Sequence, residues 1–310
     1  MSHAALRLGS RGSRLALWQA GWVREALARN GVACDIVVIK TRGDAEVDRP
    51  LQQLEGKGFF TKEIEDALLA GRIDVAVHSL KDLPTNLPEG LALAAVPPRA
   101  DPTEVLVARD PSVRSLADLT TGARVGTSSV RRSAQLRYAR ADLAVAPLRG
   151  NVPTRVAKVR GDESDGLAAA VLAGAGLERL GLSSEAAARL DPLEIMPAPG
   201  QGALGLEIRA DDDRVRATLG PLEHPESARQ VAAERALLRA IEGGCQSAVA
   251  AYVGKQDAGS GMRLYGRVTA LDGAVQLTAS APIDPAAPGA SGAAVARLLL
   301  DQGAGRLLVS

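Results

Sequence analysis

Apolar and polar positions in the first part of the chain predict strands that alternate with helices. Short apolar or β-branched runs indicate strands, and apolar side chains three or four positions apart indicate helices. The expected elements are strand Ala5 to Leu8, helix Leu15 to Arg29, strand Cys34 to Ile39, helix Thr61 to Ala70 with Thr61 as its N-cap, and strand Ile73 to Val77. This alternation favours an α/β sheet that is covered on both faces.

The pattern restarts after a proline-rich stretch, Pro97 to Pro102, and a second such stretch, Pro197 to Gly202, lies before strand Ala203 to Ile208. The elements expected between the two stretches are strands Glu104 to Val107, one near Val125, and Ala144 to Pro147, with helices Ser129 to Tyr138 and from Val152 onward. Two similar units joined by two crossings predict two lobes with a cleft between them, where ligands commonly bind.

The last part of the chain has a different pattern. Helix Ser227 to Ile241 is followed by short strands and then by helix Ser291 to Gln302. The expected strands are Val249 to Val253, Arg263 to Val268 and Val275 to Ala281. This order predicts a small α+β domain after the two lobes.

Composition narrows the class of protein. The 310 residues are 46% hydrophobic but only 2% aromatic, and 37 basic against 36 acidic residues leave a net charge of +1. Such a balance gives no general attraction to nucleic acid or to a membrane surface. No apolar run is long enough for a secretory signal or a membrane span. We therefore expect a protein of the cytoplasm, where the two cysteines, Cys34 and Cys245, stay reduced.

Three expected helix starts carry arginine. They hold Arg11, then Arg131 with Arg132, and then Arg149 with Arg155. A helix N-terminus favours anions and mildly disfavours cations, so these positions break a local rule. Any one of these arginines is best explained by solvent exposure or pairing with an acid. All three groups together favour a shared site for a polyanionic ligand.

Two further segments carry candidate chemistry. Asp82 follows an apolar strand, at the kind of strand end where α/β proteins place functional groups; the alternative is an ordinary turn aspartate before a proline. His78 on that strand is equally explained as a hydrogen-bonded core residue. Cys245, between glycine and glutamine, is a better nucleophile or attachment point than Cys34, although a small buried thiol is the ordinary alternative.

The segment Gly56 to Lys62 is bounded by glycine and holds both phenylalanines of the chain. A lid over a cleft and a surface loop that packs on the next helix are equally good interpretations.

Seven segments, in order along the chain, resemble those of hydroxymethylbilane synthases (porphobilinogen deaminases). The matching segments are Arg11 to Ala20, Thr41 to Asp44, His78 to Asp82, Gly126 to Arg132, Leu148 to Val152, Pro199 to Ala203 and Glu242 to Gln246. The resemblance implies two lobes like those of type 2 periplasmic binding proteins and a small C-terminal domain. It places domain 1 at residues 1–99 and 200–219, domain 2 at 100–199 and domain 3 at 220–310.

The resemblance also implies an activity, a cofactor and site residues. Four porphobilinogens, each losing ammonia, would be joined on a dipyrromethane held by a thioether to Cys245, with Asp82 as the catalytic carboxylate. Lys57 and Phe60 fall in the family's active-site loop. The positions that match cofactor- or substrate-binding residues are Arg11, Ser13, Lys81, Thr127, Ser129, Arg131, Arg132, Arg149, Arg155 and Arg179. No metal is implied, and a monomer is expected.

Some positions depart from the family's pattern: Gln53 replaces a lysine of some members, Arg14 stands where proline is common, and Gly161 to Ala169 is longer than usual. Two other functions fit parts of the sequence. A non-catalytic two-lobed anion-binding protein would explain the arginines but not Cys245 or the third domain. A nucleic-acid-binding protein is disfavoured by the net charge and the few aromatic residues.

Overall fold

The computed structural model describes residues 5–41, 61–161, 166–241, 248–255 and 261–308. The chain divides into two compact units, which are described separately. The first unit comprises Met1–Ala100 with Gly202–Ala228, and the second comprises Asp101–Gln201 with Arg229–Ser310. The chain passes from one unit to the other within each of the two proline-rich stretches.

The first unit is built on a five-stranded sheet with the strand order β2-β1-β3-β10-β4. β1 is parallel to both neighbours, whereas β10 returns from late in the chain and is antiparallel to β3 and β4. The elements are β1 (Leu6–Ser10), α1 (Arg14–Arg29), β2 (Cys34–Val38), α3 (Lys62–Leu69), β3 (Val75–Ser79), a 3₁₀ helix (Leu80–Asp82), β4 (Leu91–Ala95), β10 (Leu204–Arg209) and α7 (Asp213–Leu219).

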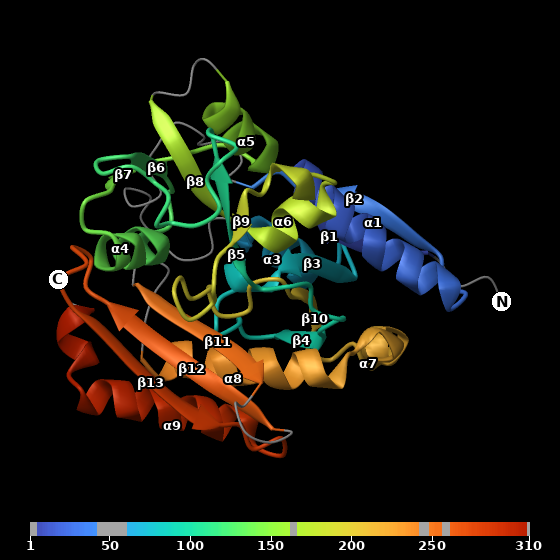
Figure 1. Cartoon of the computed structure of the whole chain (residues 1–310). Coiled ribbons are helices and arrows are strands. Elements are labelled where there is room, and N and C mark those ends of the chain that lie inside the picture. The colour runs from blue at the N-terminus through green and yellow to red at the C-terminus, as the bar shows by residue number, and fades with distance from the viewer. Residues whose placement is uncertain (1–4, 42–60, 162–165, 242–247, 256–260, 309–310) are drawn as a thin grey trace. The chain divides into compact units, whose positions relative to one another are not determined.

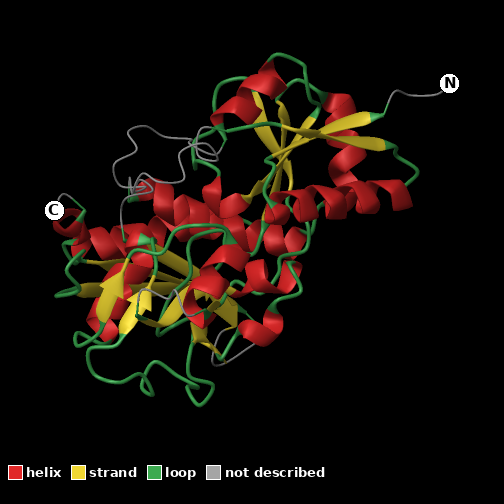
Figure 2. Cartoon of the chain, turned by 90° about the horizontal axis from the view of Figure 1, so that it is seen from above, coloured by secondary structure: helices red, strands yellow, loops and turns green. Residues whose placement is uncertain are grey.

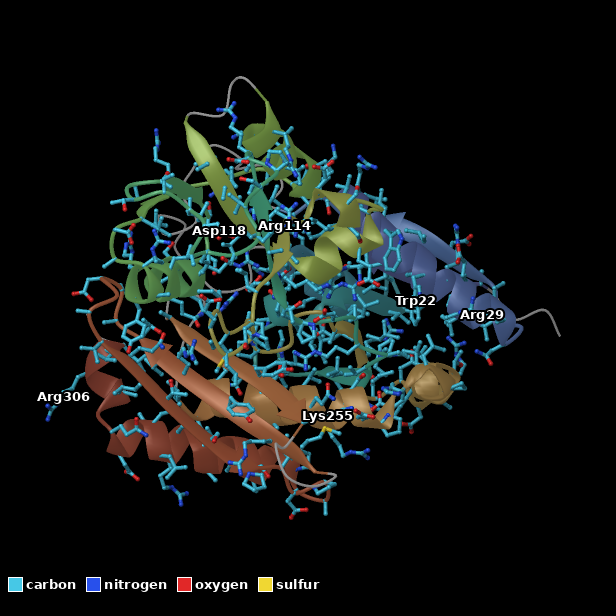
Figure 3. All side chains as sticks on the ribbon, viewed as in Figure 1. Trp22, Arg29, Arg114, Asp118, Lys255 and Arg306 are labelled. Atoms are coloured by element: carbon cyan, nitrogen blue, oxygen red, sulfur yellow. The ribbon has the colours of Figure 1, made fainter. Side chains whose placement is uncertain are left out.

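Helices cover both faces of this sheet because its strands are apolar on both sides. Val75 and Val77 of β3 pack with Leu27 of α1 in one core, and Trp22, labelled in Figure 3, packs against it. Ala76, which points to the other face, packs with residues of α3 in a second core.

The second unit begins with another five-stranded sheet, in the order β7-β6-β8-β5-β9. β6 is parallel to β7 and β8, which flank it in Figure 1, and β5 is antiparallel to β8 and β9. The elements are β5 (Glu104–Ala108), β6 (Arg124–Gly126), α4 (Val130–Ala139), β7 (Ala144–Ala146), α5 (Val152–Arg160), β8 (Leu167–Ala173), α6 (Gly174–Arg179) and β9 (Ala188–Arg189). Leu136 of α4 belongs to the core on one face, and Val156 of α5 and Leu177 of α6 belong to the core on the other.

The second unit ends with an antiparallel sheet of three strands, β11 (Val249–Lys255), β12 (Met262–Thr269) and β13 (Gln276–Pro282). Helix α9 (Pro288–Asp301) runs along β12 and β13, as the red helix beneath the orange sheet in Figure 1 shows. Leu237 of α8 (Pro225–Ala240) and Leu299 of α9 are both fully buried in its core. Figure 2 shows the chain from above, with helices in red and strands in yellow.

The expected fold class, two α/β lobes and a small C-terminal α+β domain, is confirmed by these topologies. The sequence pattern missed strands β4, β8 and β9 and helices α6 and α7. Of these, β8 lies between β5 and β6 in its sheet. Thr61 is the N-cap of α3 as expected, although its side chain makes no capping hydrogen bond. Within the described residues, no helix is both long and apolar enough to cross a membrane.

Candidate functional site

In the first unit, four predicted site residues lie at one edge of the sheet. Arg11 and Ser13 follow β1, and Lys81 and Asp82 follow β3, its parallel neighbour, so both turns leave the sheet at the carboxyl ends of the strands. Ser13 is the N-cap of α1, and its hydroxyl accepts a hydrogen bond from the Ala16 amide. Open α/β sheets bind ligands at such an edge.

A buried glutamine of α1 links this helix to the end of β3. Gln19 of α1 is 2% exposed, and its side-chain amide donates to the Ser79 hydroxyl at 2.8 Å. Ser79 is the last residue of β3 and directly precedes the 3₁₀ helix that holds Asp82. The contact therefore fixes the start of α1 against the segment that carries Asp82.

Asp82 is exposed, although the backbone around it is held firmly. Leu80 is fully buried, and its amide donates to the Ala203 carbonyl at 3.0 Å. Within the described residues, the Asp82 carboxylate has no hydrogen-bond or ion-pair partner. A turn aspartate of the ordinary kind accepts a hydrogen bond from a nearby backbone amide. Asp82 accepts none from these residues, which leaves its oxygens available to a ligand.

His78 has the core role that the sequence left open. Its Nε2 lies 3.0 Å from a carboxylate oxygen of Glu207 on β10, and the two side chains are 5% and 0% exposed. A second buried acid, Glu65 of α3, lies in the same region of the first unit. Burial, together with the Glu207 charge, raises the pKa of Glu65, although Thr61 and His78 oppose this shift.

In the second unit, the predicted residues also follow the carboxyl ends of parallel strands. Thr127 and Ser129 come after β6, and Arg149 comes after β7. The Ser128 hydroxyl joins the two turns: it donates to the Leu148 carbonyl at 2.8 Å and accepts from the Leu148 amide at 3.1 Å. Ser129 is the N-cap of α4, so the expected helix start is confirmed there.

Arg131 and Arg132 share one buried carboxylate. Glu104, at the start of β5, is 0% exposed, and each arginine is 5% exposed. Arg132 grips it at two points, Nε to Oε1 at 2.9 Å and Nη2 to Oε2 at 2.7 Å. Arg131 reaches the same Oε1 through Nη2 at 2.6 Å. Burial lowers the pKa of Arg131, and the Glu104 charge opposes that shift.

The remaining contacts of the pair are unequal. Arg131 also donates to the Met196 carbonyl, and Arg132 also donates to the Val171 carbonyl and to Gln201. A guanidinium has five N–H donors. The described contacts use two donors of Arg131 and four of Arg132. The trio thus carries one more positive than negative charge, with spare donors on Arg131, which suits it to an anionic ligand.

The other three arginines are half-buried. Arg155 of α5 donates through Nε to the Gly150 carbonyl at 2.8 Å, which braces the turn that carries Arg149. The N-cap of α5 is Asn151, as expected, and its side chain accepts from the Thr154 amide. Burial lowers the pKa of Arg179, at the end of α6, to about 10, although Glu178 opposes this shift. Arg179 therefore remains cationic near neutral pH.

Three predicted site residues lie outside the described residues: Lys57 and Phe60 in the expected loop, and Cys245. Cys34 begins β2 as expected, and burial raises the pKa of its thiol. Within the described residues, no group of histidine, cysteine, aspartate and glutamate side chains could hold a metal ion.

The sequence patterns did not single out Glu104 or Gln19. Glu104 was expected only as the first residue of a strand, where a charged side chain is usually exposed. The one available signal was the charge of Arg131 and Arg132 on a helix expected to pack against the sheet. Buried cations are usually paired with an acid.

Comparisons with known proteins agree with this layout. Residues 6–217 match the family model described as "Porphobilinogen deaminase, dipyromethane cofactor binding domain", and residues 228–301 match "Porphobilinogen deaminase, C-terminal domain". The porphobilinogen deaminase of Moorella thermoacetica is 50% identical over 305 residues, which cover 98% of this chain and 95% of that protein. That of Ralstonia nicotianae is 48% identical over 98% of this chain and 91% of that protein.

Some solved structures have a distant likeness to this chain. A periplasmic substrate-binding protein of an ABC transporter from Coxiella burnetii is 14% identical and covers 74% of this chain and 96% of that chain, with a TM-score of 0.41. The family models and the relatives, in contrast, span nearly the whole chain. The chain therefore belongs to the porphobilinogen deaminase (hydroxymethylbilane synthase) family of transferases, which use a dipyrromethane cofactor.

Proposed function

We propose that this chain joins four porphobilinogen molecules head to tail, with loss of ammonia at each addition, and then releases the linear tetrapyrrole hydroxymethylbilane by hydrolysis. The observation that carries this proposal is the unbalanced positive charge of the buried trio Arg131, Glu104 and Arg132. Each pyrrole of the substrate bears an acetate and a propionate, so a growing chain is a polyanion.

The described residues fit a dipyrromethane, whose side chains are carboxylates. Arg131 has unused donors beside a single carboxylate, and donors of this kind bind carboxylates through short charge-assisted hydrogen bonds. Thr127, Ser129, Arg149, Arg155 and Arg179 would add hydroxyl and guanidinium donors. When bound through Cys245, the cofactor supplies the primer whose free pyrrole carbon accepts the first substrate unit.

Asp82 has the role of catalytic carboxylate in this proposal. Its oxygens would accept hydrogen bonds from pyrrole N–H groups and stabilise the positive charge that develops as ammonia leaves. The same carboxylate can assist proton transfer. The exposure of Asp82 and its lack of a partner within the described residues support this role.

Arg11, Ser13 and Lys81, at the same sheet edge as Asp82, would hold the carboxylates of the incoming porphobilinogen. Lys57 and Phe60 would act from the active-site loop. The proposed division into three domains is 1–99 with 200–219, 100–199, and 220–310. We further propose that the chain acts in the cytoplasm as a monomer and binds neither nucleic acid nor membrane.

Substitution of Asp82 tests this assignment against a matched control. Asp82→Asn should lower kcat for hydroxymethylbilane formation by about 10²- to 10³-fold, the range found when one electrostatic contact to a transition state is lost. Its thermal midpoint should stay unchanged, because no described contact depends on the carboxylate.

The control is Asp74→Asn in the same unit. Asp74 accepts from Arg7 at 2.7 Å and lies 3.5 Å from Arg209, so its loss should lower the thermal midpoint and leave kcat near normal while the protein is folded. Near-normal turnover in Asp82→Asn would remove Asp82 from the mechanism. A wild-type chain that binds porphobilinogen but forms no tetrapyrrole would instead favour the non-catalytic anion-binding alternative.

A further inference from the structure

Arg267, an arginine of the C-terminal sheet, is buried against the part of the second unit that holds Arg131 and Arg132. Arg267 lies on β12 and is 5% exposed. Its Nη1 donates to the side-chain oxygen of Gln135 on α4 at 2.9 Å and to the Glu194 carbonyl at 3.0 Å. Its Nη2 donates to the Leu193 carbonyl at 2.6 Å. The guanidinium therefore makes its hydrogen bonds outside its own sheet.

No carboxylate forms an ion pair with this cation within the described residues, and its Nε has no hydrogen-bond partner there. Burial lowers the pKa of Arg267, while Tyr138 and Asp191 oppose that shift. Burying an ion without an opposite charge is unfavourable, and an apolar side chain of similar volume often gives a more stable protein. A role in stability alone therefore explains Arg267 poorly.

Gln135 lies between Arg267 and the Met196 backbone, which Arg131 also contacts. It is 1% exposed, and its Oε1 accepts from both Arg267 and the Met196 amide, the latter at 2.8 Å. Its Nε2 donates to the Met196 carbonyl at 3.0 Å. Arg131 donates to this same carbonyl. One buried carbonyl is thus shared by Gln135, which Arg267 orients, and by Arg131, which has spare donors for an anion.

The segment from residue 193 to 201 is held by the C-terminal domain at further points. The Ala251 amide of β11 donates to the Pro197 carbonyl at 3.2 Å. Glu234 of α8, which is 0% exposed, accepts from the Gly200 amide at 2.8 Å and from the Val253 amide at 3.1 Å. On its other side, the segment is bound by Gln135, Arg131 and Arg132. The segment therefore connects the two parts of the second unit physically.

We infer that Arg267 is a positioning residue, which acts through Gln135 and Met196 to hold the C-terminal domain and Arg131 in a fixed mutual arrangement. This inference rests on the proposed function, in which the C-terminal domain carries the attached primer at Cys245 and Arg131 binds its carboxylates. Loss of Arg267 would let the primer and the arginine shift relative to each other without removing either of them.

The test compares Arg267→Leu with Arg263→Leu in the full-length, cofactor-loaded enzyme. Arg263 lies on the same strand, but its guanidinium donates to Ser280 of β13 at 3.2 Å and so stays within the C-terminal sheet. Arg267→Leu should lower kcat/KM by about tenfold, within the range of coupling between contacting residues. Arg263→Leu should remain within about twofold of wild type, as surface substitutions usually do.

Amide hydrogen exchange gives a readout that does not depend on activity. The Met196 amide, which donates to Gln135, should exchange about tenfold faster in Arg267→Leu than in wild type, because local opening becomes easier. The Arg263 variant should show no change. Faster exchange with unaltered kcat/KM would reduce Arg267 to a purely structural residue, and unaltered exchange would overturn the contact chain itself.

A double-mutant cycle with Gln135→Met tests whether Arg267 acts through Gln135. If it does, the double variant should be no slower than the worse single variant, whereas losses that multiply would overturn the inference. If Arg267→Leu fails to fold, Arg267→Lys retains a buried cation and should show a smaller loss in both readouts. A wild-type protein without attached pyrrole would defeat the proposed function, and the exchange measurements would still decide the role of Arg267.

Discussion

Glu104, Arg131 and Arg132 are all nearly or fully buried. The single negative charge of Glu104 can balance the positive charge of only one of the two arginines. Such a trio is stable only when its remaining donors and lone pairs are hydrogen-bonded, because buried ions lose their hydration. Among the described residues, hydrogen bonds engage four of the five donors of Arg132 but only two of those of Arg131. The two neighbouring residues therefore have different roles: Arg132 holds Glu104, and Arg131 is available to a ligand.

This difference predicts unequal effects of the same substitution. Arg132→Leu removes the two-point contact with Glu104 and should destabilise the protein by about 3–5 kcal/mol, as breaking a buried ion pair does. Arg131→Leu leaves that contact intact, so it should lower stability less and impair cofactor loading more. Thermal unfolding and intact mass measure the two effects. A larger loss of stability in Arg131→Leu would contradict the assignment.

Glu65 allows a test of pH dependence in the first unit. A carboxyl group whose pKa is raised in the folded state contributes most stability below its unfolded pKa and loses that contribution as pH rises through the folded pKa. The pKa of Glu65 is raised above its usual 4.5, chiefly by burial. Glu65→Gln should therefore be no more stable than wild type near pH 4.5, and increasingly more stable as pH rises through the folded-state pKa of Glu65. A stability difference that shrinks with rising pH would contradict the raised pKa.

At the scale of elements, helices α8 and α9 lie close together at a glycine. A methyl group on Gly292 of α9 would lie 2.3 Å from the Ala233 carbonyl oxygen and 2.9 Å from the Leu237 nitrogen. Both are backbone atoms of α8, so the contact cannot be relieved by moving a side chain. Gly289, one turn earlier in α9, has nothing within 4 Å of that position.

The two glycines thus form a matched pair. Gly292→Ala should destabilise the C-terminal domain by about 1–3 kcal/mol or more, the usual range for overpacking. Gly289→Ala should be neutral or stabilise by up to about 1 kcal/mol, because alanine favours a helix. Chemical unfolding of both variants measures the difference. Equal stabilities would show that α8 and α9 do not pack as closely as described.

Some helices and strands could be predicted from the sequence pattern, and others could not. The amphipathic spacing of α1 and the β-branched run of β2 predicted both elements to within one residue at each end. β8 was missed because its sequence, Leu-Ala-Ala-Ala-Val-Leu-Ala, is dominated by a strong helix former. Its strand conformation is imposed by pairing with β5 on one side and β6 on the other, which a local pattern cannot reveal.

At the scale of the whole molecule, residues far apart in sequence make the decisive contacts. β10 enters the first sheet from beyond the second proline-rich stretch, and Glu104, Gln135 and Arg267 come from three separate parts of the chain. The arginines at helix starts could be predicted because each one breaks a local rule. Their buried acid and the Gln135 contacts could not, because these depend on which elements meet in space.

The central claim, a covalent pyrrole primer on Cys245, is tested most directly by the intact mass of the purified protein beside a Cys245→Ser variant. We predict that the wild-type protein is heavier than its bare sequence by a two-pyrrole unit, either as purified or after addition of porphobilinogen. The variant should match its bare sequence under both conditions. A wild-type mass that equals the bare sequence even after porphobilinogen is added would contradict the account.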